Sequence, residues 1–206
     1  AESNVAVGNN ALNDNTTGSS NVAVGGNALD VNTTGDNNTA VGRNALGANT
    51  TADNNTAVGR DALEANTTGY DNTAVGHLAA TAITTGIRND AVGKGALNAL
   101  TTGNSNSAVG YYAGGALTTG AYNVAIGRAA LSTATTSESN TAVGYNAAYS
   151  ATIGNTNTSI GREAMYTNVA ADRNTALGYR SLYTMSRSTT ADTYHVAVGN
   201  ESLYSC

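Results

Sequence analysis

The amino-acid sequence predicts an all-β protein, a parallel β-solenoid or β-roll of twelve stacked 17-residue coils. Three observations lead to this prediction. A glycine recurs at a fixed period, a short segment of small and β-branched residues precedes each copy, and large apolar residues are scarce. The 206 residues include 24 Gly and 11 Tyr but no Pro, Trp or Phe. Because the apolar residues are mostly Ala and Val, the core has to be thin, as it is in solenoids, whose units contact only their neighbours.

The recurring glycine defines the period. It returns every 17 residues, and the last copy follows after 21, which indicates a four-residue insertion at about 188–194 before the final coil. Glycine tolerates positive φ, so we expect each copy in the turn that follows a short strand. No linker interrupts the pattern, and we interpret residues 1–206 as a single repeat domain. The predicted turn glycines are Gly8, Gly25, Gly42, Gly59, Gly76, Gly93, Gly110, Gly127, Gly144, Gly161, Gly178 and Gly199.

An asparagine opens each coil, whose consensus is N-T-A-V-G-R-N-A-L-x-A-N-T-T-G-x-N. His195 takes this place in the last coil. Identical side chains stacked one coil apart can form a hydrogen-bonded ladder, as they do in cross-β structures. The predicted ladder comprises Asn4, Asn21, Asn38, Asn55, Asn72, Asn89, Asn106, Asn123, Asn140, Asn157 and Asn174.

The second half of the coil, for example residues 60–66, leaves alternatives open. Its adjacent Ala and Leu and its helix-forming neighbours suit one helical turn, a second short strand or an irregular turn. We favour an irregular or helical turn. The Thr-Thr-Gly that follows predicts the return turn of the coil.

The strand is small or apolar on both faces. Side chains alternate along a strand, so the central Ala lies on one face and its two neighbours, Thr or Val and then Val or Ile, lie on the other. This pattern is typical of a strand that is covered on both sides. The face that bears Val7, Val24 and Val41 needs a cover from the second half of the coil or from a symmetry-related chain. Since exposed apolar stripes mark interfaces, the sequence favours an oligomer of identical chains around a shared axis.

The segments N-T-A-V-G and N-V-A-I-G, the latter at residues 123–127, resemble the head repeats of YadA-type trimeric autotransporter adhesins. They are also similar to repeats of bacteriophage tail fibres and bacterial surface fibres. The resemblance implies a left-handed parallel β-roll with three chains side by side. It further implies the shaft or head of an extracellular fibre, on a cell surface or a virion. The 17-residue period departs from the usually shorter repeats of adhesin heads.

Charge and motif content exclude several classes of function. Nine Lys and Arg against fourteen Asp and Glu argue against nucleic acid as a partner. No apolar run is long enough for direct membrane insertion. The two histidines occupy different coil positions, and neither a P-loop nor a metal-ligand spacing is present. We therefore expect no enzyme, no catalytic or metal-binding residues and no cofactor, and the single cysteine, Cys206, excludes a disulfide framework.

The position after each turn glycine forms a candidate surface-binding stripe. Stacking of the coils would line up basic and aromatic side chains there, with cation–π contacts between Arg and Tyr. One interpretation is a solvated ladder that prevents edge-to-edge pairing, and the other is a contact line for carbohydrate or anionic polymers. The stripe comprises Arg43, Arg60, His77, Lys94, Tyr111, Arg128, Tyr145, Arg162 and Tyr179.

The sequence thus predicts a structural or adhesive fibre protein that binds itself and a cell-surface glycan or receptor. Ten of the eleven tyrosines follow residue 103, which suits either capping of the stack or an adhesive tip. The repeated Thr-Thr pairs leave an ice-binding β-solenoid as an alternative, and a purely structural, self-assembling filament subunit is another.

Overall fold

The computed structural model describes residues 2–185 and 191–205. The chain divides into two compact units, Ala1–Thr102 and Gly103–Cys206. The fold is an all-β parallel β-solenoid of about eleven turns with coils of about 17 residues, which confirms the predicted class. The described residues contain no helix, so the second half of the coil is a series of non-helical turns. Accordingly, no helix capable of crossing a membrane occurs among them.

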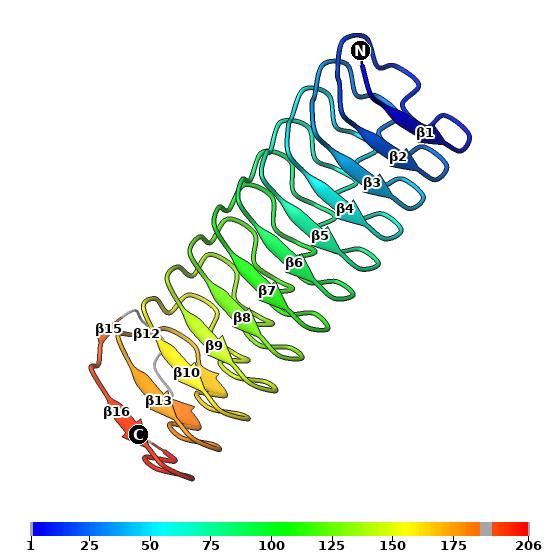
Figure 1. The fold of residues 1–206 in the computed structure, drawn as a ribbon. Coiled ribbons are helices and arrows are strands. Elements are labelled where there is room, and N and C mark those ends of the chain that lie inside the picture. Colours follow the sequence, from blue (N-terminus) through cyan, green and yellow to red (C-terminus); the bar gives the residue numbers. More distant parts are fainter. Residues whose placement is uncertain (1, 186–190, 206) are drawn as a thin grey trace. The chain divides into compact units, whose positions relative to one another are not determined.

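The first unit stacks six three-residue strands in sequence order, each parallel to the next (Figure 1). The register is one coil: Ala40 pairs with Ala57, for example. Every side chain therefore lies beside the side chain of the same coil position in the neighbouring coils. The strands are β1 (Val5–Val7), β2 (Val22–Val24), β3 (Thr39–Val41), β4 (Thr56–Val58), β5 (Thr73–Val75) and β6 (Asp90–Val92).

The second unit has main strands in the same kind of parallel order and adds two short ladders, β11 with β14 and β12 with β15. The added ladders lie where the other coils have turns, at their return side. The main strands are β7 (Ser107–Val109), β8 (Val124–Ile126), β9 (Thr141–Val143), β10 (Thr158–Ile160), β13 (Thr175–Leu177) and β16 (Val196–Val198). The added strands are β11 (Thr167–Asn168), β12 (Ala171–Asp172), β14 (Thr184–Met185) and β15 (Ala191–Asp192).

Strand register locates the insertion before the last coil. Thr167 pairs with Thr184, 17 residues on, whereas Ala171 pairs with Ala191, 20 residues on. Thr175 then pairs with Val196, 21 residues on. Of the predicted insertion at about 188–194, residues 188–190 lie outside the described residues, as does Cys206.

The second coil is an example of the buried side chains. In the second coil Ala23, Ala28 and Leu29 are fully buried, together with two asparagines, Asn21 and Asn32. Side chains alternate between the two faces of a strand, so the central alanine faces inward and the residues on either side of it face outward. The resulting core is thin and is continued from coil to coil.

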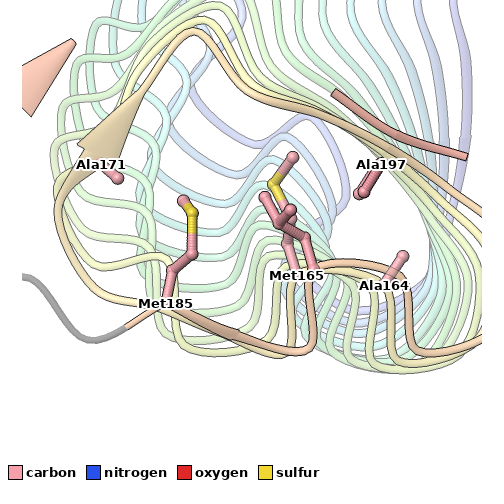
Figure 2. Packing of buried hydrophobic residues seen from close by; sticks show 7 residues of the cluster. Ala164, Met165, Ala171, Met185 and Ala197 are labelled. Carbon is pink, nitrogen blue, oxygen red and sulfur yellow. The ribbon is translucent and has the colours of Figure 1, made fainter. Parts of the chain in front are cut away.

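Two methionines enlarge the core near the end of the second unit. Met165 takes the place of the buried Leu, and Met185 takes the place of the second buried Asn. Figure 2 shows both side chains inside the coil, in a cluster with Ala164, Ala171 and Ala197. Methionine suits this position because its flexible side chain adapts to an irregular interior.

The buried asparagines form a ladder that joins side chains to the backbone. The backbone N–H of Asn38 donates to Oδ1 of Asn21 at 2.9 Å, and its Nδ2 donates to the carbonyl oxygen of Ala52 at 2.8 Å. A second ladder, which is not among the predicted ones, joins the other buried amides. Asn49 Nδ2 donates to Oδ1 of Asn32 at 2.8 Å. Buried polar groups need such partners, so the asparagines serve the stacking of the coils.

The turn glycines combine a positive φ with close contact between coils. Gly25 has a φ of 137°, and a Cβ there would lie 2.5 Å from the carbonyl oxygen of Gly42. All twelve predicted turn glycines have φ between 120° and 141°. Non-glycine residues also adopt positive φ, among them Leu29 at 49° and Asn37 at 59°. The consensus sequence does not predict a positive φ for leucine. Burial of the leucine side chain offsets the strain of the left-handed conformation.

Candidate functional site: an aromatic and cationic groove

An apolar stripe covers the outer face of the strands. Val58, Val75 and Val92 are 36%, 37% and 38% exposed, whereas the alanine between each pair of outward residues is fully buried. The second half of the coil therefore leaves this face partly exposed in the single chain. We call these residues the valine stripe; its exposed members are Val7, Val58, Val75, Val92, Val109, Ile126, Ile160, Leu177 and Val198.

In the first unit the predicted basic and aromatic stripe consists of basic residues and one histidine. Arg43, Arg60 and Lys94 are exposed and His77 is half-buried. Arg60 forms an ion pair with Asp61, with Nε and Oδ2 2.7 Å apart. Burial raises the pKa of Asp61, but hydrogen bonds from Arg60 and Asn44 outweigh it and leave the pKa below its ordinary value.

In the second unit the same stripe alternates tyrosine with arginine. The guanidinium carbon of Arg128 lies 5.8 Å from the ring centre of Tyr111 and 5.6 Å from that of Tyr145. Arg162 lies 5.7 Å from the rings of both Tyr145 and Tyr179. These distances suit cation–π attraction, so each arginine is held between two rings.

A stack of tyrosines lies beside the stripe. Tyr149, Tyr166, Tyr183 and Tyr204 occupy one coil position, with successive ring centres 5.2, 5.2 and 5.0 Å apart and the planes within 11° of parallel. We call these four residues the tyrosine ladder. Burial raises the pKa of Tyr166. The number of tyrosines does not predict this ladder, but the spacing of 17 residues from Tyr149 to Tyr166 and on to Tyr183 identifies it in the sequence.

A groove of about 320 Å³ separates the stripe from the ladder position. The stripe contributes Tyr111, Arg128 and Tyr145 to its lining. The ladder position contributes Ser132, Tyr149 and Tyr166, and Tyr112, Ala129 and Asn146 lie between the two. We call this the aromatic groove.

The arginines near the groove differ in their ionic partners. Glu163 is 7% exposed and accepts hydrogen bonds from Arg180 Nε at 2.7 Å and from Arg162 Nη2 at 3.2 Å. The hydrogen bond from Arg180 holds the pKa of the Glu163 carboxyl below its ordinary value, against the effect of burial and with help from Arg162. Arg128 has no carboxylate partner in the part of the chain that the structure describes. The aromatic groove thus carries one uncompensated positive charge.

The first unit has a groove of different chemistry at a similar place in the coil. This groove of about 370 Å³ is lined by Asn27, Asp30, Asn44, Gly47 and Glu64, among others. Its polar side chains are amides and carboxylates, and it has no aromatic lining. Within residues 2–185 and 191–205, no cluster of three or more His, Cys, Asp or Glu side chains could hold a metal ion.

No protein-family model matches the chain, and neither a curated protein nor a solved structure matches it. The protein is therefore described by its architecture, a parallel β-solenoid repeat protein with coils of about 17 residues.

Proposed function

We propose that the chain is the shaft or head of an extracellular trimeric fibre that attaches to cell-surface or glycan targets. The observation that carries this proposal is the valine stripe, whose exposed members along the outer strand face of each unit are 36% to 62% exposed. Contiguous exposed apolar surface of this kind is typical of interfaces between proteins.

A second copy of the chain is well suited to cover the stripe. The stripe repeats at one spacing along each stack of strands, and a symmetry-related copy presents the same spacing. Side-by-side association of copies would bury apolar residues from every coil at once. The resemblance of N-T-A-V-G and N-V-A-I-G to the heads of trimeric adhesins supports three copies around one axis and a location on a cell surface or a virion.

The mass of the full chain in solution, measured by light scattering, tests this assembly. We expect three times the chain mass of 20.6 kDa. A triple variant, Val58→Lys, Val75→Lys and Val92→Lys, should be monomeric, because association would bury three unpaired charges in each copy. A matched control, Thr51→Lys, Thr68→Lys and Thr85→Lys, alters exposed residues on the return side of the coil and should stay trimeric. A monomeric wild-type chain would refute the trimer.

Ice binding is a second candidate, favoured by the exposure of Thr34, Thr51 and Thr68, the second residues of their Thr-Thr pairs. The first residue of each pair is engaged differently: the Thr33 hydroxyl donates to the carbonyl oxygen of Thr50 at 2.9 Å, and neighbouring coils repeat this bond. The pairs therefore offer a single row of exposed hydroxyls. A monomeric chain that inhibits ice recrystallisation would favour this candidate over the fibre.

A further inference from the structure

We propose that the aromatic groove of the second unit binds a saccharide ring that bears a carboxylate. The sugar ring lies against Tyr149 at the level of Ser132, and its carboxylate pairs with Arg128. The inference rests on the proposed adhesive function and names the class of ligand and the residues that take it.

The tyrosine ladder ends at Tyr149, beside the aromatic groove. Tyr166 has a ring on each side, Tyr149 on one and Tyr183 on the other, whereas the ring of Tyr149 has one aromatic neighbour in the described chain, that of Tyr166. One coil before Tyr149 the ladder position holds Ser132, whose small side chain lines the groove. One face of the Tyr149 ring is thus left without an aromatic partner, and a ring-shaped ligand above Ser132 would extend the stack by one member.

The positive charge of Arg128 lies in the same groove as the open face of the Tyr149 ring. Arg128 belongs to the same coil as Ser132 and lines the same groove. Its guanidinium is placed between the rings of Tyr111 and Tyr145 and has no carboxylate partner in the described chain. An arginine held in this way loses little conformational freedom on binding, and its planar group matches a carboxylate through two parallel hydrogen bonds.

The remaining lining favours a sugar over a flat aromatic acid. Four residues that line the groove carry polar side-chain groups, namely Tyr112, Ser132, Asn146 and Tyr149. A pyranose has an apolar C–H face for the tyrosine ring and a rim of hydroxyls for such groups, whereas an aromatic acid would leave them unpaired. The shape and the charge together therefore fit a uronic acid residue of a polysaccharide.

Titration calorimetry with the full chain tests the proposal, with an oligomer of glucuronic acid as the probe and a neutral glucose oligomer and benzoate as comparisons. We expect binding of the acidic oligomer and at least tenfold weaker binding of the other two. Arg128→Gln should weaken binding of the acidic oligomer about tenfold or more, the usual effect of losing a charge-assisted pair. Arg173→Gln removes an exposed arginine outside the groove and should bind like the wild type.

Ser132→Tyr is the sharpest variant, because the new ring would stack on Tyr149 and occupy the proposed site. It should abolish binding of the acidic oligomer without lowering the melting temperature. Undiminished binding by Ser132→Tyr or by Arg128→Gln would overturn the proposal, as would no binding by the wild type or equal binding of the neutral oligomer or of benzoate. The mass of each variant separates the two proposals: a trimer that binds no sugar refutes only the ligand, and a monomer that binds it refutes only the fibre.

Discussion

The two units share an interior and differ on the outside. Residues 1–102 contain one tyrosine and residues 103–206 contain ten. At the ladder position the first unit has Asp30, Gly47 and Glu64, where the second has Tyr149, Tyr166 and Tyr183. The inward positions, by contrast, hold Asn, Ala and mostly Leu in both. Stacking of the coils therefore keeps most inward positions alike, whereas outward positions can change their chemistry without changing the coil.

The hydrogen bonds of the asparagines that open the coils are the same in both units, whereas the second amide ladder runs only from Asn15 to Asn66 in the first. Asn55 N–H donates to Oδ1 of Asn38 at 2.9 Å in the first, and Asn157 N–H donates to Oδ1 of Asn140 at 2.9 Å in the second. Even His195, where the asparagine is missing, donates its N–H to Oδ1 of Asn174 at 3.0 Å. A substitution in this shared frame should therefore act alike in both units, and one on the outside should not.

The largest effect is expected at the turn glycines. Gly25→Val combines a strained φ with a Cβ 2.5 Å from the carbonyl oxygen of Gly42 and should cost more than about 3 kcal/mol of unfolding free energy. Gly144→Val should cost a similar amount in the second unit, since its Cβ would meet the carbonyl oxygen of Gly161 at the same distance. Urea denaturation of the full chain measures both.

The neighbouring Gly26 provides the control for Gly25. A Cβ at Gly26 has no atom within 4 Å, and this glycine is not among the residues with positive φ. Gly26→Val should change the free energy of unfolding by less than about 0.5 kcal/mol, as surface substitutions usually do. Equal losses at Gly25 and Gly26 would contradict the assignment of the turn.

A smaller effect should distinguish the units. Tyr166→Ala removes two ring contacts of the tyrosine ladder and should cost about 1–3 kcal/mol, given roughly 0.5–1.5 kcal/mol for each aromatic pair. Tyr70→Ala, in the first unit, removes only a partly exposed ring with Arg88 at 6.0 Å and should cost less than about 1 kcal/mol. Equal losses in thermal unfolding would mean that the ladder adds nothing to the stability of the second unit.

The smallest effect is the pH dependence that one carboxylate, Glu163, contributes in the second unit. Because the folded-state pKa of Glu163 lies below its ordinary value of 4.5, its stabilising contribution is complete above that value and is lost as the pH falls through the folded pKa. Glu163→Gln should therefore lower stability at pH 7 and reduce the loss of stability between pH 5 and pH 3. Glu138→Gln, an exposed residue with no ion pair in the described chain, should leave this profile as it is. An unchanged profile in Glu163→Gln would contradict the role given to this carboxylate.

The sequence predicted the period, the parallel stack and the inward alanines, because each depends on a residue type that recurs at one spacing. It left the second half of the coil open, since Ala and Leu suit helix, strand and turn alike. The structure resolves this half as turns with Asn27 and Leu29 at positive φ. A buried leucine in that conformation has no local signal, because contacts with the neighbouring coils, rather than local preference, hold it there.

The sequence by itself determined that the chain is a solenoid of 17-residue coils and that basic and aromatic side chains line up after the turn glycines. The period of the sequence is enough to predict both the solenoid and the stripe, since stacking in register places identical coil positions side by side. Three features required the tertiary structure. The valine stripe is exposed, and the tyrosines stack into a ladder that ends at Tyr149. Arg128 lies in the groove beside that end and has no carboxylate partner in the described chain. Those facts depend on which coil positions lie side by side around the cross-section, and the path of the turns fixes that.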